Sequence, residues 1–575
     1  MKSPPIAPEH PLKSLKARLS AALGGLSTAN LTDQLAAVRG TAEAIVLDRP
    51  LDVAGFEQGE WTYADVADFV ARAAACLHHD AGVQPGHVVA VCTSNALDMP
   101  LLLLAVLRLG ATAVPLNHQM RADEIRFIVR DCGATVLIAD RTIEAEVHAL
   151  CQHDGPNNPL QHVVWAPDAP PDVLEPPIDG AVSFHALTSR LTDALPEPPA
   201  ATADPDAVCA IFCTSGTTGF PKGAMLTSRS LLDSFRWLLL LPPWPRFDAL
   251  LALPIAHIMG FAAFIGFLVS GLRIHFFEKF DAHRVLDALE GEDIDGFIGV
   301  PSMYQLLANA GAAERDLRGV RVFASAADVM PGHLIAAFKH AGQTFGRVAG
   351  APPIPATFVE VYGSVELSGA AMVRISLPWV SPSIDGFVGL PLPGYRARVL
   401  GPDGAELSRG QTGELFIRGP GVFKGYLTEP SAPAEGASVG PSEPGWLRTG
   451  DLAQRTRLGF VRFVGRDKDV IKTGGYSVFP AELETRLLLH PDIIKAAVVG
   501  VPHPTRGATP IAVVCLRPGA EPDDEAILRW LQSHVARYKA PRRVVIIDPD
   551  QMPYGATGKI EKRLLRERFK DLLHP

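Results

Sequence analysis

The sequence predicts an α/β protein whose sheets, parallel in large part, are covered by helices and built around more than one hydrophobic core. The chain has 575 residues, which is too many for one ordinary domain and enough for several sizeable cores. Apolar residues make up 47 % of it, which excludes a largely disordered chain. Between residues 33 and 200, short apolar runs alternate with segments of helical periodicity. This alternation is typical of parallel sheets with helices on their faces.

The elements of this first part follow from local patterns. Thr62 and Asp65 have the spacing of a capping box, and Val66 and Phe69 then fall on one face of the helix that it would open. Residues 100–109 are apolar, predict a second helix and end at a glycine. Buried strands are expected at residues 88–92, 113–116, 136–139 and 163–165.

The rest of the chain continues the pattern. Residues 251–272 are almost all apolar and long enough to suggest a membrane span. Pro254, His257 and two glycines interrupt this run, so we expect a buried helix against a sheet instead. Pro301 and Pro480 are each expected to open a helix. Further strands are expected at residues 207–212, 297–300, 320–324, 357–361, 496–501, 511–516 and 544–547.

Charge and cysteine content narrow the function classes. The formal net charge of −9 does not indicate a nucleic-acid surface. The seven cysteines form no Cys-x-x-Cys pair and share no ligand spacing with histidines, so no zinc site is expected. Residues 1–32 lack the apolar core of a secretory signal, and with an odd cysteine count this favours a reducing, cytoplasmic setting. Leu12, Leu15 and Leu19 define one helix face, which we expect to pack on the body rather than to anchor in a membrane.

Residues 214–223, with the sequence Thr-Ser-Gly-Thr-Thr-Gly-Phe-Pro-Lys-Gly, carry the strongest chemical signal in the chain. Their glycines allow a tight loop whose backbone amides point inward, a concavity that binds phosphate. The hydroxyls and Lys222 add donors and a positive charge. Pro221 precedes the lysine and Gly223 follows it, so the loop is not a Walker A sequence. The alternative, a flexible surface turn, does not explain serial hydroxyls and a lysine after a buried strand.

This stretch resembles the phosphate loop of the adenylate-forming, or AMP-binding, superfamily, which includes acyl-CoA synthetases, aryl-CoA ligases, luciferases and peptide-synthetase adenylation domains. The resemblance extends from Trp61 to Arg566, and the chain is identified as a member of the acyl-CoA synthetase or fatty-acid–CoA ligase type. Four further motifs of the superfamily occur here in the same order: residues 362–366 (Tyr-Gly-Ser-Val-Glu), 446–451 (Trp-Leu-Arg-Thr-Gly-Asp), 465–469 (Gly-Arg-Asp-Lys-Asp) and 553–560 (Pro-Tyr-Gly-Ala-Thr-Gly-Lys-Ile).

The resemblance implies two domains and a two-step reaction. Residues 1–465 would form a large ATP- and acyl-binding body of mixed and parallel sheets with flanking helices. Residues 466–575 would form a small, mobile α+β domain that pivots near Lys468. ATP, Mg²⁺ and CoA are the implied cofactors, because the acid would first become acyl-AMP and then be transferred to CoA. No nucleophilic side chain is needed, since ATP activates the acid while positioning and charge lower the barrier.

The resemblance also assigns roles to single residues. Lys559 and Lys222 are the implied catalytic cations, and Glu366 is implied both in catalysis and as the magnesium ligand. Tyr362 would stack on adenine, and Asp451 would accept both ribose hydroxyls. The implied ATP and AMP site comprises Thr214, Ser215, Gly216, Thr217, Thr218, Gly219, Ser325, Ala326, Ala327, Tyr362, Gly363, Ser364, Asp451 and Arg466. The implied acyl and CoA site comprises His257, Gly260, Gly299, Gly369, Gly474 and Gly475.

Two residues near these motifs are unusual. Val365 stands where the superfamily usually has threonine, so it keeps the branched shape but loses a hydroxyl that would contact a nucleotide phosphate. Ser364 is a candidate substitute donor. Asp328 follows the small-residue turn at 325–327, and no role follows for it from the sequence.

The acid is predicted from the segments expected to line its pocket. Residues 258–261, 325–327 and 369–373 are small or apolar and offer no cation for a second carboxylate. Peptide-synthetase domains usually place an aspartate soon after the histidine motif, and residues 261–264 contain none. A medium- or long-chain fatty acid is therefore favoured over an amino acid, with an aromatic or alicyclic acid as the alternative.

Two other functions stay open at this point. An acyl-AMP ligase would load an acyl carrier protein in place of CoA. A non-catalytic nucleotide- or acyl-CoA-binding relative is disfavoured, because Lys222, Glu366, Asp451 and Lys559 are all retained. The expected partners are a small carboxylic acid, ATP and CoA, without nucleic acid or an integral membrane segment, and weak membrane association is compatible with this list.

Overall fold

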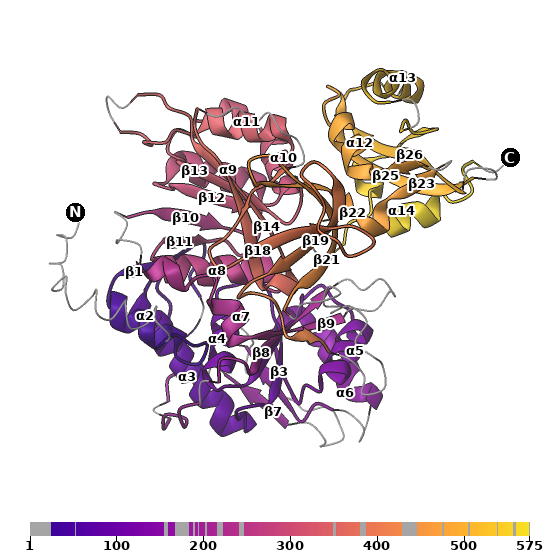
Figure 1. Ribbon diagram of the computed structural model, residues 1–575. Coiled ribbons are helices and arrows are strands. Elements are labelled where there is room, and N and C mark those ends of the chain that lie inside the picture. Colours follow the sequence, from indigo (N-terminus) through magenta and orange to yellow (C-terminus); the bar gives the residue numbers. More distant parts are fainter. Residues whose placement is uncertain are drawn as a thin grey trace.

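The computed structural model arranges the chain into three sheets that share a large body and a fourth sheet in a smaller C-terminal unit (Figure 1). It describes residues 25–51, 53, 55–154, 159–166, 183–187, 190–193, 195–201, 204–214, 222–240, 246–348, 352–379, 387–427, 445–473, 476–503, 507–521, 523–536, 539–555 and 559–573. The predicted leucine-faced helix near the N-terminus lies outside these residues.

The first sheet has eight strands, in the order β20-β9-β8-β4-β3-β5-β6-β7. The strands from β3 to β8 pair in parallel, while β9 and β20 are antiparallel to their neighbours. Their bounds are β3 (Val88–Cys92), β4 (Thr112–Pro115), β5 (Val136–Ala139), β6 (His162–Trp165), β7 (Ser183–Ala186), β8 (Val208–Thr214), β9 (Lys222–Thr227) and β20 (Gly425–Tyr426). The strands predicted in this part of the chain are thus confirmed, with ends shifted by one or two residues.

Helices cover both faces of this sheet. Alternate residues of β3 separate the faces, because Val89 and Val91 join one core while Ala90 and Cys92 join another. The helices of the first face are α3 (Tyr63–Ala81) and α4 (Asp98–Arg108), and those of the second are α5 (Ala122–Cys132) and α6 (Glu144–Asp154). α3 begins at the predicted capping box, in which the Thr62 hydroxyl accepts from the Asp65 amide and the Asp65 carboxylate accepts from the Thr62 amide.

The second sheet has nine strands, in the order β17-β15-β14-β13-β12-β10-β11-β1-β2. Its six inner strands are parallel, and β2, β15 and β17 pair antiparallel at its two ends. The bounds are β1 (Glu43–Leu47), β2 (Glu60–Thr62), β10 (Asp248–Leu251), β11 (Arg273–Phe276), β12 (Gly296–Gly299), β13 (Val322–Ala326), β14 (Thr357–Ser364), β15 (Gly369–Ser376) and β17 (Leu390–Pro391). β13 starts later than predicted because the Val320 amide closes a turn onto the Leu317 carbonyl.

The predicted buried helix of the apolar run is α8 (Ile258–Ser270), which joins the core between the two large sheets. Phe261 on this helix lies 5.9 Å, between ring centroids, from Phe212 of β8. The opposite face of the nine-stranded sheet is covered by α9 (Ala282–Gly291), α10 (Pro301–Asn309) and α11 (Gly332–Ala341). No helix among the described residues is both long and apolar enough to cross a bilayer.

The third sheet and the C-terminal unit complete the fold. The third sheet is antiparallel and contains β16 (Phe387–Val388), β18 (Arg396–Leu400), β19 (Thr412–Arg418), β21 (Leu447–Arg455) and β22 (Val461–Arg466). The C-terminal unit contains β23 (Ile471–Thr473), β24 (Tyr476–Val478), β25 (Ile493–His503), β26 (Gly507–Leu516) and β27 (Val544–Ile546), with α12 (Pro480–Leu487), α13 (Asp524–His534) and α14 (Lys562–Arg568). Two small cores lie on its two faces, and α12 contacts β22 of the third sheet (Figure 1, yellow and orange).

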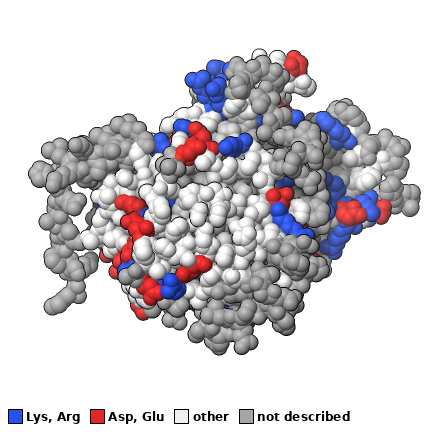
Figure 2. All heavy atoms as spheres, turned by 90° about the horizontal axis from the view of Figure 1, so that it is seen from below, with Lys and Arg blue, Asp and Glu red and all other residues white. Residues whose placement is uncertain are grey.

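Charged side chains do not gather into one patch on the face seen from below. Figure 2 shows blue and red residues in small groups in which both signs occur, separated by broad uncharged areas. Among the described residues on this face, the distribution agrees with the prediction that the protein does not present a nucleic-acid surface.

Candidate active site

The candidate site begins where three neighbouring parallel strands end. β12 ends at Gly299, β13 at Ala326 and β14 at Ser364. In register, Gly299 pairs with Ser325 on the next strand. Because the carboxyl ends of parallel strands meet at one edge, the fold brings the predicted adenine-side and acyl-side turns together.

The turn after β13 is narrow and made of small residues. Ser325 is 1 % exposed, and Ala327 has a φ of 73°, in the left-handed region that non-glycine residues seldom occupy. The next residue, Asp328, is exposed, and its Oδ1 accepts from the Val329 amide at 2.8 Å. This conformation lays the chain flat across the strand end.

Close backbone packing shapes the turn after β14. A Cβ on Gly363 would lie 1.7 Å from the Gly369 carbonyl oxygen, so only glycine fits there. Ser368 (φ 52°) and Gly369 (φ 117°) turn the chain back into β15. Glu366 sits between these points in the short 3₁₀ helix η7 (Val365–Leu367). Val365 packs against the central core, so the residue that replaces the usual threonine has an apolar environment.

The carboxylate of Glu366 is hydrogen-bonded to a tyrosine that the sequence analysis did not assign to the site. The Tyr426 hydroxyl donates to Glu366 Oε1 at 2.5 Å, and Lys222 Nζ lies 5.8 Å from the centre of the Tyr426 ring. Burial, and then the Glu366 charge, hold the pKa of the Tyr426 phenol well above its usual value, so it stays a donor. Tyr426 follows Gly425 in β20, a segment that the sequence analysis left without a role.

Asp451, the predicted ribose ligand, lies in a second polar cluster. It is 5 % exposed in β21; its Oδ2 accepts from the Tyr362 hydroxyl at 2.6 Å, and its Oδ1 lies 3.2 Å from Arg466 Nε. β21 and β22 pair Asp451 directly with Arg466. Burial raises the pKa of Asp451, whereas Arg466 and the Tyr362 hydrogen bond oppose that rise. The predicted adenine, ribose and phosphate contacts therefore adjoin one another.

Lys559 reaches this cluster from the C-terminal unit. Its loop is closed by a Tyr554–Ile560 bridge and by the Gly555 amide, which donates to the Lys559 carbonyl at 2.9 Å. Burial lowers the pKa of the Lys559 ammonium, and the carboxylates of Asp328, Asp451 and Glu366 oppose that shift while Arg466 reinforces it. The ammonium is therefore placed among the charges of the large body. Lys468, the predicted pivot, lies outside this cluster, exposed in the 3₁₀ helix η8 (Asp467–Asp469) between β22 and β23.

The predicted acyl-side residues lie around the start of α8. His257 precedes this helix, and a Cβ on Gly260 would lie 2.2 Å from the Pro254 carbonyl oxygen, so the glycine permits close packing there. A Cβ on Gly369 would lie 3.0 Å from that of Ala262, which places the β15 turn beside α8. The neighbouring half-buried side chains of α8, β12 and α10 are apolar, among them Met259, Ala263, Phe267, Ile298 and Met303.

Some predicted residues lie outside the described part of the chain, namely Ser215, Gly216, Thr217, Thr218, Gly219, Gly474 and Gly475. The two ends of the phosphate loop are described. Thr214 and Lys222 are paired in the β8–β9 hairpin, and Thr214 Oγ1 donates to the Lys222 carbonyl at 3.3 Å. The loop therefore leaves the sheet and returns to it at one point.

The donor set fits a magnesium ion that is held mainly by substrate. A carboxylate oxygen is a hard ligand that Mg²⁺ accepts, and Glu366 presents one close to the phosphate-loop strand. No group of three or more histidine, cysteine or acidic side chains arranged for a metal occurs among the described residues. One or two carboxylates completed by nucleotide phosphates and water is the usual way to hold Mg²⁺ in such sites.

Comparisons with known proteins agree with this geometry. The sequence profile of the AMP-binding enzymes matches residues 34–427, and that of the AMP-binding enzyme C-terminal domain matches residues 482–559. Indoleacetate–CoA ligase of Aromatoleum aromaticum is 32 % identical over 89 % of this chain and 94 % of its own. Feruloyl-CoA synthase of an Amycolatopsis species is 32 % identical over 88 % of this chain and 94 % of its own. ATP-bound MatB of Rhodopseudomonas palustris superposes with a TM-score of 0.75 at 27 % identity, covering 95 % of this chain and all of the other.

The motifs, their order and the architecture lead to the same conclusion. The predicted fold class, a mixed α/β body with a small C-terminal sheet unit, is confirmed. The chain belongs to the AMP-binding enzyme family, as an AMP-forming carboxylate–CoA ligase that uses ATP, Mg²⁺ and CoA.

Proposed function

We propose that the protein converts an aromatic or arylalkyl carboxylic acid into its CoA thioester through an acyl-AMP intermediate. The observation that carries the mechanism is the position of Lys559, which comes from the C-terminal unit and lies among Glu366, Asp451 and Arg466 of the large body. We assign residues 1–465 to the nucleotide- and acyl-binding body and residues 466–575 to a mobile domain that pivots near Lys468.

In the first step, an oxygen of the acid carboxylate attacks the α-phosphorus of ATP. The new O–P bond forms as the α–β phosphoanhydride bond breaks, and pyrophosphate leaves. Lys559 offsets the negative charge that gathers where this bond forms, and Lys222 faces the phosphates. Bound at Glu366, Mg²⁺ would supply charge neutralisation to the triphosphate. Tyr362 and Asp451 orient the adenosine, and their mutual hydrogen bond fixes the relative position of the two groups.

In the second step, the C-terminal domain rotates and withdraws Lys559. The thiol sulfur of CoA then attacks the acyl carbon, a C–S bond forms, the C–O bond to phosphate breaks and AMP leaves. The thiol proton is released to solvent. We assign the Gly474–Gly475 loop to the pantetheine path, because two consecutive glycines allow a narrow ligand to pass close to the backbone.

The relatives favour a ring-bearing acid. Indoleacetate and ferulate, named for the two ligases above, are both aromatic acids. The half-buried side chains beside α8 are apolar, and Met259, Phe267 and Met303 suit a flat aromatic ring. The medium- or long-chain fatty acid expected from the sequence has the same apolar character but finds no support in these two relatives.

The test measures AMP release with ATP, Mg²⁺ and CoA against a panel of acids, with the thioester identified by mass. The panel pairs arylacetic and cinnamic acids with octanoic and palmitic acids. We expect thioester from the aromatic members and at least tenfold less from the aliphatic ones. A preference for palmitate would restore the fatty-acid assignment. Pyrophosphate without CoA thioester would indicate a carrier-loading enzyme, and ATP binding without any product would support the non-catalytic alternative.

A further inference from the structure

A short strap joins the two halves of the phosphate site. The backbone of residues 423–427 bonds to both sides, because the Phe423 amide donates to the Glu366 carbonyl at 2.9 Å and the Leu427 amide donates to the Gly223 carbonyl at 2.7 Å. Between these points, β20 pairs with β9 and sets Tyr426 opposite Ala224. The strap thus spans from the glutamate turn to the strand that begins with Lys222.

Tyr426 stands between two opposite charges. Its hydroxyl donates to the Glu366 carboxylate, and its ring lies beneath the Lys222 ammonium. Glu366 and Lys222 do not pair with each other in the part of the chain that the structure describes, although a carboxylate and an ammonium this close to one partner would attract. A phenol satisfies both at once, since its O–H is a donor to the carboxylate and its π-face attracts a cation.

We propose that Tyr426 is a positioning residue that keeps Glu366 and Lys222 apart and aims them separately at magnesium and at the nucleotide phosphates. The inference rests on the proposed function. The hydroxyl fixes the carboxylate through a charge-assisted bond, and the ring fixes the ammonium without neutralising it. Both charges are then available to the ligand, whereas a direct Glu366–Lys222 ion pair would have to be broken each time ATP bound.

The two contacts of Tyr426 can be removed separately. Tyr426→Phe deletes the hydroxyl and keeps the ring beneath Lys222, whereas Tyr426→Leu deletes both. Tyr395→Phe is the matched control, because Tyr395 is also a buried tyrosine, and its hydroxyl lies 2.7 Å from Ser234 Oγ. Thermal unfolding of the three variants verifies that each is folded.

The first measurement is calorimetric binding of α,β-methylene-ATP to the full chain, with Mg²⁺ and with EDTA. For Tyr426→Phe we expect affinity with Mg²⁺ to fall about 10- to 100-fold, the weight of a hydrogen bond to a charged group, and affinity in EDTA to stay at the wild-type value. Tyr426→Leu should lose affinity in both conditions, because Lys222 also loses its support. Tyr395→Phe should match the wild type in both.

A result of wild-type affinities for Tyr426→Phe, or of equal losses with and without Mg²⁺, would overturn the inference. A second measurement separates positioning from general damage. Pyrophosphate exchange with the acid found in the panel should fall in Tyr426→Phe, while thioester formation from the synthetic acyl-AMP should not. If the wild-type protein itself does not bind the ATP analogue, the proposed function fails and the inference falls with it; normal wild-type binding with an unaffected variant rejects the inference alone.

Discussion

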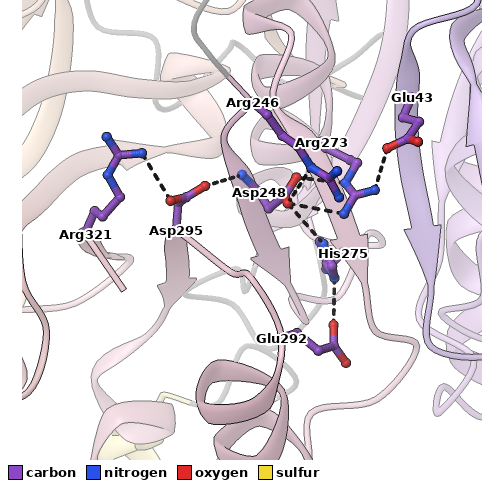
Figure 3. Close-up of polar contacts among 8 residues, drawn as sticks. All are labelled: Glu43, Arg246, Asp248, Arg273, His275, Glu292, Asp295 and Arg321. Atoms are coloured by element: carbon purple, nitrogen blue, oxygen red, sulfur yellow. Dashed lines mark hydrogen bonds and ion pairs between the residues drawn. The ribbon is translucent and has the colours of Figure 1, made fainter. Parts of the chain in front are cut away.

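The two edges of the nine-stranded sheet carry charged residues in opposite arrangements. At the amino edge, Asp248 at the start of β10 receives Arg273 from β11, with Nε–Oδ1 and Nη2–Oδ2 distances of 2.8 and 3.2 Å (Figure 3). Asp295, before β12, accepts from the Asp248 amide and pairs with Arg321 before β13. Each charge at this edge is answered by another charge of the same chain.

At the carboxyl edge the charges are held by neutral groups instead. The Glu366 carboxylate is bound by a tyrosine hydroxyl, and the Asp451 carboxylate by another tyrosine, with Arg466 beside it. The same fold thus uses ion pairs where a sheet must be closed and phenols where charges must face a ligand. We infer that the amino edge contributes stability and the carboxyl edge contributes chemistry, and the following changes test that division.

The largest effect should come from the residue that the C-terminal unit adds to the carboxyl edge. Lys559→Ala should slow adenylate formation by about 10² to 10³-fold, because a charge aimed at the reacting phosphate is lost. Thioester formation from pre-made acyl-AMP should be largely kept, since Lys559 has withdrawn by then. Pyrophosphate exchange and single-turnover thioester formation measure the two steps. Lys570→Ala, an exposed lysine paired with Glu567, is the control; equal loss of both steps in Lys559→Ala would contradict the two-pose mechanism.

At the amino edge, the corresponding change should affect stability alone. Asp248 is 1 % exposed, and Asp248→Asn removes the charge that Arg273 and Arg246 face, at a cost of about 3 kcal/mol in the free energy of unfolding. Urea unfolding measures this loss, and kcat at 25 °C should be unchanged. Asp316→Asn, at the exposed Arg318 pair, should leave stability close to that of the wild type. A fall in kcat without a fall in stability would erase the distinction between the edges.

A buried pair between the two edges should respond to pH. Glu360 of β14 lies 3.1 Å from Arg374 of β15, and burial raises its pKa to about 7, with Arg374 opposing the rise. Because the folded protein holds this proton more tightly than the unfolded chain, stability falls as pH rises from about 4.5 to about 7, by at most roughly 3 kcal/mol. Glu360→Gln should flatten this slope in thermal unfolding between pH 5 and pH 8. The exposed Glu525→Gln should keep the wild-type slope, and an unchanged slope in Glu360→Gln would reject the assignment.

Much of the fold and the order of the site residues could be predicted from local patterns. Apolar runs predicted the strands, and Pro254 correctly argued that the long apolar segment is a buried helix, which begins at Ile258. Tyr426 was missed because a Gly-Tyr pair has no local signature, and its role arises only from the pairing of β20 with β9. The Tyr362–Asp451 bond was equally inaccessible, since it joins two different sheets.

Asp328 shows the same limit and supplies the smallest expected effect. No role followed for it from the sequence, but its charge raises the pKa of both Lys559 and Lys562 across the contact with the C-terminal unit. Asp328→Asn should therefore weaken the adenylate-forming pose and slow pyrophosphate exchange by about 2- to 5-fold at low salt, as for an exposed charge pair. The difference from the wild type should shrink in 0.5 M NaCl, because salt screens exposed charges at these distances.

The control for this change is Glu314→Gln, an exposed acid elsewhere on the large body, which should leave the exchange rate unaltered at both salt concentrations. Thioester formation from pre-made acyl-AMP should also be unaltered in Asp328→Asn, because Lys559 and Lys562 move away together in the second pose. A loss that persists at high salt, or that appears equally in both steps, would show that Asp328 acts on the turn after β13 and not on the C-terminal unit. The carboxyl edge would then owe its charge to the large body alone, and the contrast between the edges would no longer depend on a second domain.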